Sequence, residues 1–179
     1  YFTRSLPVGI SGTKYAVRVR STSPVVKGEP AYIRIFNATP AAPIAITGNL
    51  SICTNLEPTT TYSVDKVVNA QAYKWEISPK WAGTISGTDT FAIVTWDTNA
   101  VSATVTIKAR AYNACDTSGY APNLTVKTNK CIFTSPSGIF CAGSTFKIPF
   151  STPTGGIYNA GNLFRAELSD ASGSFTAPG

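Results

Sequence analysis

An alternation of apolar and polar residues runs through the middle of the chain. In residues 73–77 apolar side chains alternate with charged ones, and every second residue from 101 to 111 is apolar. A period of two puts successive side chains on opposite faces of a β-strand. Both segments are therefore predicted to be strands with one face in a hydrophobic core. The core residues that this pattern predicts are Tyr73, Trp75, Val105 and Ile107.

Strand signals recur at short intervals between residues 44 and 129. They are short stretches of β-branched and aromatic residues, separated by Gly, Pro, Asn and Asp. The predicted strands cover residues 44–47, 51–54, 60–64, 72–77, 90–96, 101–113 and 123–128. Seven short strands in about 86 residues are typical of a β-sandwich of the immunoglobulin type. We therefore predict an all-β fold with a complete immunoglobulin-like sandwich in residues 40–129.

The two ends of the chain have the pattern of incomplete domains. Residues 1–39 contain two strand signals, at 14–22 and 31–38, and a stiff Thr-Pro-Ala-Ala-Pro segment follows at 39–43. The tail, residues 130–179, contains early strand signals and a last strand region at 163–175. Together the two ends are about as long as the middle domain. We expect residues 1–39 to be the C-terminal half of one immunoglobulin-like domain and residues 130–179 to be the N-terminal half of the next.

An internal repetition supports a tandem array. The segment at 137–150, SGIFCAGSTFKIPF, repeats the pattern of the segment at 50–64, LSICTNLEPTTTYSV. Each has an apolar residue, Cys, a polar spacer, Thr, an aromatic residue and a β-branched residue two positions later. Repeated segments of this kind are typical of proteins built from successive copies of one domain. We expect the apolar faces of both chain ends to contact neighbouring repeats or copies along a fibre.

Four cysteines can form three sets of two disulfides. Their spacing does not fit a zinc site, so we expect structural disulfides in an oxidising compartment. The parity of the longest strand, continued past its end, brings Cys115 to the inner face. The order Cys53, Trp75, Cys115 is the one in which an immunoglobulin sandwich packs an indole on an inter-sheet disulfide. We predict Cys53–Cys115 with Trp75 beside it, and Cys131–Cys141 across a turn; two free buried thiols are the alternative for Cys131 and Cys141.

The composition argues against catalysis. The chain has no His, which removes the commonest general base and the commonest zinc ligand. Asp89, Asp97 and Asp116 could meet at one end of the sandwich and bind calcium, but they lack the spacing of a calcium loop, and turn capping is favoured. Asp170 lies in a turn rich in Ser and Gly. We predict no catalytic residues, no cofactor-binding residues and no enzyme; calcium is the one metal that stays open.

Charge and aromatic residues limit the partners. The net charge is +6, but the basic residues, such as Lys14, Arg18 and Arg20, are spread along the chain without interleaved exposed aromatics. We therefore expect no nucleic-acid partner. No apolar run reaches 18 residues, so no membrane span is expected. Trp81 is the best candidate for an exposed aromatic residue; it could stack on a sugar, but a place over the core edge or a domain junction is favoured.

Several segments resemble a known family. The segments at 73–87, 93–96 and 103–126, YKWEISPKWAGTISG, IVTW and ATVTIKARAYNACDTSGYAPNLTV, resemble the PKD-like, immunoglobulin-like domains of Bacteroidota surface proteins. The segments FRAELSDASGSFTAP and KYAVRVRSTSP resemble the partner domain that alternates with them. Such repeats are similar to those of giant cell-surface adhesins of the gliding-motility type. The resemblance implies a position at the cell surface and export by the type IX secretion route.

These observations favour a structural protein. We expect immunoglobulin-like (PKD-like) β-sandwiches in tandem, which act as a structural repeat of a long secreted cell-surface adhesin or extracellular filament. The alternative is a glycan-binding module of a secreted protein, with surface glycans as the partner. A glycan module would need two or three aromatic side chains in one exposed line, which the sequence does not obviously supply.

Overall fold

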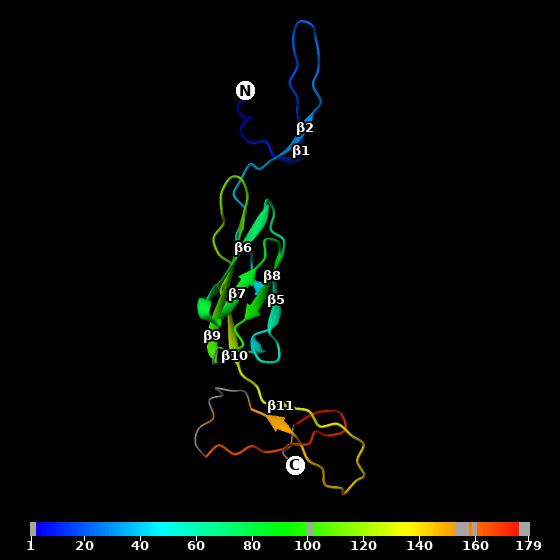
Figure 1. The fold of residues 1–179 in the computed structure, drawn as a ribbon. Coiled ribbons are helices and arrows are strands. Elements are labelled where there is room, and N and C mark those ends of the chain that lie inside the picture. Colours follow the sequence, from blue (N-terminus) through cyan, green and yellow to red (C-terminus); the bar gives the residue numbers. More distant parts are fainter. Residues whose placement is uncertain (1–2, 100–101, 153–157, 159–160, 176–179) are drawn as a thin grey trace.

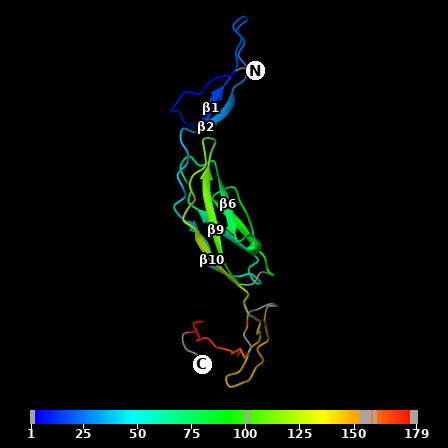
Figure 2. The ribbon, with the colours of Figure 1, turned by 90° about the vertical axis from the view of Figure 1, so that its left-hand side faces the viewer.

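The computed structural model describes residues 3–99, 102–152, 158 and 161–175. These residues form β-strands and one short 3-10 turn, and no α-helix occurs among them. The elements are β1 (Gly12–Val17), β2 (Ala31–Ile35), β3 (Ile46–Thr47), β4 (Ser51–Cys53), β5 (Thr59–Val64), β6 (Ala72–Ser78), η1 (Lys80–Ala82), β7 (Gly83–Ser86), β8 (Phe91–Trp96), β9 (Ala103–Tyr112), β10 (Leu124–Asn129), β11 (Phe133–Thr134) and β12 (Phe150–Ser151). A hairpin lies at one end of a central sandwich, and the tail lies at the other end (Figures 1 and 2).

The central sandwich consists of two four-stranded sheets. One sheet has the order β4-β10-β9-β6 and the other has the order β3-β5-β8-β7. All neighbours are antiparallel except β4 and β10, which are parallel. The chain crosses between the sheets at one side of the sandwich, because β3 is the edge strand of one sheet and the next strand, β4, is the edge strand of the other. This is the strand arrangement of an immunoglobulin-like sandwich, so the predicted fold class is confirmed.

The core follows the parity that the sequence predicts. In β9 the buried residues are the odd-numbered ones, and Val105 and Ile107 are completely buried. In β6 the odd-numbered residues Tyr73, Trp75 and Ile77 are buried as well. The inner faces of the two sheets meet at these side chains. All four residues expected in the core therefore lie in it.

Both buried tryptophans have hydrogen-bond partners for their indole N–H groups. Trp75 donates to the backbone carbonyl of Asp89 at 3.1 Å, and Trp96 donates to Oγ1 of Thr60 at 2.8 Å. Tyr62 contacts Trp96 edge-on, with ring centroids 6.5 Å apart. A buried aromatic residue stabilises most when its polar atom is satisfied. Both indole donors are therefore satisfied: the Trp75 bond links β6 to the β7–β8 loop of the other sheet, and the Trp96 bond joins β8 to β5 within one sheet.

The sequence pattern missed one strand of the sandwich, β7. It has only four residues, and Gly83 begins it. A Cβ atom at Gly83 would lie 2.5 Å from the carbonyl oxygen of Thr95, so the close pairing of β7 with β8 requires glycine here. In the sequence Gly83 interrupts the strand pattern, but in the structure it is the residue that allows this pairing. The long strand predicted at 101–113 is β9, which begins at Ala103; residues 100–101 lie outside the described part of the chain.

The head hairpin, β1 and β2, is an antiparallel pair with no second sheet on either face among the described residues. Its apolar residues Val17 and Val19 are 50% and 61% exposed, whereas Ile35 next to the sandwich is buried. An isolated two-stranded hairpin is marginally stable in water. The head thus has the exposed apolar surface of an element without its packing partner.

The tail contains only the two-residue strands β11 and β12 within its described residues. The strand predicted at 163–175 is not formed there, and this prediction is wrong. Leu163 and Leu168 are exposed, and no strand of the described residues pairs with this segment. The turn predicted at Asp170 is present, because its carboxylate accepts hydrogen bonds from the N–H groups of Ser172 and Ser174, both at 2.9 Å. The hydroxyl of Ser172 also donates to this carboxylate at 2.6 Å, and this bond is the main cause that lowers the pKa of Asp170; the N–H donors add to it.

Candidate functional sites

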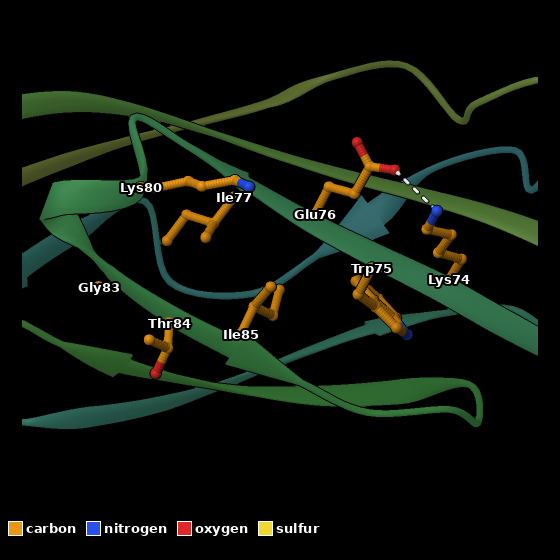
Figure 3. Close-up of a pocket in the computed structure, with 8 residues that line it drawn as sticks. All are labelled: Lys74, Trp75, Glu76, Ile77, Lys80, Gly83, Thr84 and Ile85. Atoms are coloured by element: carbon orange, nitrogen blue, oxygen red, sulfur yellow. Dashed lines mark ion pairs between the residues drawn. The ribbon is translucent and has the colours of Figure 1, made fainter.

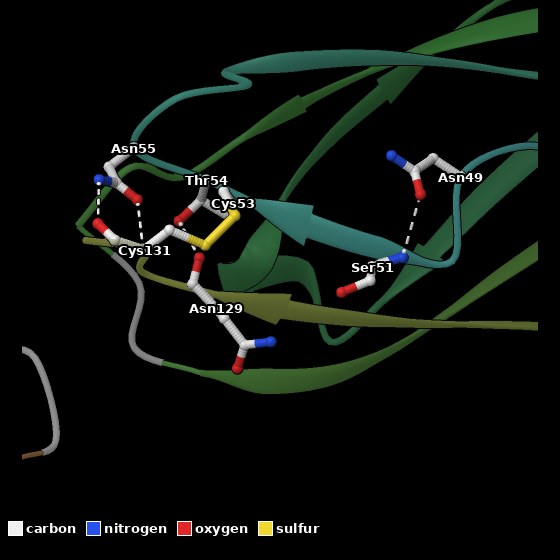
Figure 4. Close-up of a disulfide and its surroundings, with 7 residues drawn as sticks. All are labelled: Asn49, Ser51, Cys53, Thr54, Asn55, Asn129 and Cys131. Atoms are coloured by element: carbon white, nitrogen blue, oxygen red, sulfur yellow. Dashed lines mark hydrogen bonds between the residues drawn. A yellow bond between two sulfur atoms is a disulfide. The ribbon is translucent and has the colours of Figure 1, made fainter. Parts of the chain in front are cut away.

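A disulfide staples the sandwich where the chain leaves it for the tail. Cys53, the last residue of β4, is bonded to Cys131, two residues after β10, with Cα atoms 5.4 Å apart. Figure 4 shows Asn55 beside this bridge. Its side chain donates to the carbonyl of Cys131 at 3.0 Å and accepts from the Cys131 N–H at 2.9 Å. The bridge and the amide together fix the chain at this junction.

Both predicted cysteine pairs, Cys53–Cys115 and Cys131–Cys141, are wrong. Cys115 and Cys141 are free, exposed thiols. The first error came from extending strand parity past the end of β9 at Tyr112. Cys53 ends β4, which pairs with β10, so the chain just after β10 brings Cys131 within reach of it. Trp75 is buried as expected, but the disulfide predicted beside it does not exist.

Asn113 follows the last residue of β9 and joins the sandwich to the head. Its Oδ1 accepts hydrogen bonds from the N–H groups of Cys115 at 2.8 Å and Asp116 at 3.2 Å, which turns the chain. Its Nδ2 donates to the carbonyls of Ala38 at 2.8 Å and Asn69 at 2.9 Å. The side chain is buried. Its hydrogen bonds hold the turn after β9 and tie this turn to the segment that leads to the head. The sequence pattern did not mark Asn113 as a junction residue, although an Asn after a long strand is a turn signal.

Cys115 lies at the same junction as Asn113. Its Sγ is 3.4 Å from the carbonyl oxygen of Phe36, the residue after β2. The junctions at the two ends of the sandwich therefore differ: a disulfide holds the tail side, and hydrogen bonds hold the head side.

A cluster of charged side chains covers the outer face of the β4-β10-β9-β6 sheet. Glu76 is its only acid: its Oε1 accepts a hydrogen bond from the Tyr120 hydroxyl at 2.6 Å and lies 3.8 Å from Arg110 and 3.9 Å from Lys74. The Tyr120 hydrogen bond is the main cause that lowers the pKa of Glu76, and the cations add to it. The guanidinium of Arg110 lies over the Tyr120 ring, 4.7 Å from its centroid. Glu76 is therefore an ionised carboxylate with its partners in place, not a proton donor.

A groove lies between β6 and β7, the free edges of the two sheets (Figure 3). Its volume is about 540 Å³, within the range of ligand-binding pockets. The lining residues are Lys74, Trp75, Glu76, Ile77, Lys80, Gly83, Thr84 and Ile85. The apolar side chains form its floor and two lysines lie on its rim. The sequence did not reveal this groove, because β7 was not recognised as a strand.

The acidic residues considered for calcium cap turns instead. Asp89, Asp97 and Asp116 accept hydrogen bonds from the N–H groups of Thr90, Asn99 and Thr117, respectively. Among the described residues no three His, Cys, Asp or Glu side chains gather as metal ligands would. The arrangement therefore gives no support to a calcium site in this part of the chain.

Trp81 is the exposed aromatic residue that the sequence predicted. It lies in η1, the short turn between β6 and β7, and is 55% exposed. Its neighbour Lys80 lines the groove, and Ala82 on its other side is buried. More than half of Trp81 is thus accessible to a partner.

The central sandwich matches a known family. Residues 39–126 match the model of the PKD-like domain. This part of the chain is similar to the PKD-like domain family. No curated protein and no solved structure matches the chain. The matched residues begin before β3 and end within β10.

The similarity to the PKD-like domain indicates the general class of this part of the chain. Its fold is generally a non-catalytic, extracellular type, and the Cys53–Cys131 disulfide fits the same oxidising environment. The described residues form no helix with the length and hydropathy needed to cross a membrane. An extracellular structural or binding module is therefore the class that the fold supports.

Proposed function

We propose that the chain is a structural repeat of a long secreted cell-surface adhesin or extracellular filament, of the gliding-motility type found in Bacteroidota, without catalysis. The observation that carries the proposal is the exposed apolar surface at both ends of one complete PKD-like domain. In the head Val17 and Val19 are exposed, and in the tail Leu163 and Phe150 are exposed. A monomeric domain rarely leaves such surfaces open, and they mark contacts with other domains. Type IX secretion is the export route that goes with this proposal.

The head and the tail are proposed to be complementary halves of one immunoglobulin-like domain. The head supplies a late hairpin, and the tail supplies the segments that resemble β4 and β5 of the PKD-like domain. The two parts lie at opposite ends of the sandwich (Figures 1 and 2). The head of one copy therefore meets the tail of the next along a fibre.

Sedimentation velocity of the full chain tests this assembly. We expect association that grows with protein concentration, because each copy offers both halves of the missing domain. Replacing Val17 and Val19 together by Asp should abolish it, since charge on the hairpin face opposes burial. The matched control replaces Val25 and Val26 by Asp; these are equally exposed but lie in the hairpin loop. A chain that stays monomeric at about 100 µM, well above the micromolar dissociation constants of ordinary assemblies, would contradict the proposal.

The exposed Trp81 keeps the second function, a glycan-binding module, open to test. A sugar ring would stack on its exposed indole. Glycan-array binding that is lost in Trp81→Ala and kept in Phe91→Ala, another exposed aromatic residue of the sandwich, would favour this function over the structural one.

A further inference from the structure

The groove between β6 and β7 has a property that the proposed function does not use: both of its walls are open strand edges. β6 ends one sheet and β7 ends the other, on the same side of the sandwich. Figure 3 shows η1 joining them at one end of the groove. At the other end, the N–H of Tyr73 donates to the carbonyl of Thr88 in the β7–β8 loop at 3.0 Å. The groove is therefore closed at both ends and open along its length.

On β6, the backbone groups of Trp75 and Ile77 point into the open side. Backbone direction alternates along a strand, so residues two apart bond to the same side. The hydrogen bond of Tyr73 to Thr88 is on the side away from β9, and Trp75 and Ile77 share that direction. No strand of the described chain pairs with β6 there. Their N–H and C=O groups are thus available to an added strand.

On β7, the same argument applies to Gly83 and Ile85. The carbonyl of Ala82 accepts a hydrogen bond from the N–H of Asp97 at 2.9 Å, so Ala82 bonds toward β8. Alternation then turns the backbone groups of Gly83 and Ile85 away from β8, toward the groove. Gly83 is itself buried, so Ile85 is the residue of β7 that offers its backbone groups. Each wall therefore has backbone donors and acceptors that no strand of the described chain pairs.

The charge on the rim of the groove is positive. Lys74 and Lys80 line it, and Lys108 joins Lys80 at an adjoining hollow of about 260 Å³. Among the described residues neither Lys80 nor Lys108 forms an ion pair. Glu76 offsets only one of these charges, because its single carboxylate lies among Lys74, Arg110 and Lys108. The rim therefore attracts carboxylates and repels basic segments.

We propose that this groove binds an extended, acidic segment of a partner protein, which pairs with the edge of β6 as an added strand. Its apolar side chains would share the inner side with Trp75 and Ile77, and its carboxylates would share the outer side with Lys74 and reach Lys80. About three to five residues fit, at about 3.4 Å per residue. Lysines at a strand edge also discourage unselective pairing, so the charge selects acidic strands over apolar or basic ones.

Hydrogen exchange measured by NMR tests the pairing directly. The probe is the capped peptide Thr-Glu-Val-Glu-Val-Glu-Thr, added to the full chain. Saturating peptide should slow exchange of the Trp75 and Ile77 amides. The amides of Lys74 and Glu76, which bond to β9, should keep their rates. No change at Trp75 and Ile77, or changes confined to another surface, would overturn the proposal.

Two controls separate strand pairing from simple charge attraction. A peptide with N-methyl groups on alternate residues keeps its charges but cannot form the ladder, so its binding should be lost; equal binding would overturn strand addition. Lys80→Glu should weaken binding by about three- to tenfold, the range of one reversed charge contact. Lys127→Glu makes the same charge change on the exposed face of β10 and should have little effect. Equal weakening of peptide binding by both variants would show that the net charge of the protein attracts the peptide nonspecifically, and it would overturn the proposed site.

Discussion

Residues 50–64 of the sandwich and residues 137–150 of the tail share one sequence pattern, but the apolar residue before its Cys and the aromatic residue after it are buried in the sandwich and exposed in the tail. In the sandwich Ile52 and Tyr62 are completely buried, whereas the tail residues in the matching places, Phe140 and Phe146, are exposed. In the sandwich, β4 pairs with β10 and β5 pairs with β8. The tail has no such later strands among its described residues, and its two phenylalanines stack on each other, 4.4 Å apart.

The cysteines of the two segments differ in the same way. Cys53 is bonded to a residue that follows β10, the strand beside it, while Cys141 in the matching place is free. An amphipathic pattern thus specifies which face of a strand is apolar, but burial and bonding require the neighbouring strands. The following predictions test this difference, beginning with the largest expected effect.

Truncating an aromatic residue should give the largest difference in stability loss between the two regions. Trp75→Ala should lower the free energy of unfolding by about 3–5 kcal/mol, because a large buried side chain is replaced by a cavity. The matched tail variant, Phe146→Ala, should cost less than about 0.5 kcal/mol, as at an exposed site. Urea unfolding followed by far-ultraviolet circular dichroism measures both. Comparable losses in the two variants would mean that the tail has a packed core of its own.

Removing the disulfide should have the next largest effect. Replacing Cys53 and Cys131 together by Ala should cost about 2–4 kcal/mol, since the bridge closes a long loop in the unfolded chain; the two residues are 78 apart in sequence. Replacing Cys115 and Cys141 should leave stability unchanged under non-reducing conditions, because both are free. Peptide mapping without reductant should recover Cys53 linked to Cys131. Recovery of a Cys53–Cys115 peptide would refute this pairing.

Breaking the hydrogen-bonded junction should have an intermediate effect. Asn113→Ala removes four hydrogen bonds and leaves the carbonyl of Ala38 without its amide donor. The expected cost is about 1–3 kcal/mol. Faster hydrogen exchange near residues 36–38 should accompany it. Asn99→Ala, in an exposed turn, is the control and should change neither quantity.

The smallest effect belongs to the surface charge cluster. The folded pKa of Glu76 lies below its ordinary value of 4.5, so the ionised carboxylate stabilises the fold above that pH. This contribution should disappear as the pH falls from about 4.5 through the lowered folded pKa. Because the group is exposed, Glu76→Gln should cost less than about 1 kcal/mol at pH 7, and salt should reduce the loss. Glu57→Gln, without an ion pair in the described chain, is the control; the same pH dependence in both variants would contradict this assignment.

The sequence by itself determined the fold class, most strands and the core faces. Side-chain parity is a local property of extended backbone, so Trp75 and Val105 could be placed inside without knowledge of their neighbours. The Asp170 turn was predictable for the same reason, because its hydrogen bonds span only a few residues.

Only the tertiary structure decided the disulfide, the strand β7 and the groove. Parity ends where a strand ends, and Asn113 turns the chain before Cys115 can lie on the inner face. The partner of Cys53 depends on β4 lying beside β10, which no local pattern encodes. β7 and the open edge that it forms likewise exist because the backbone at Gly83 can approach β8 closely. Pairing between distant segments, rather than the pattern within each, decided these features.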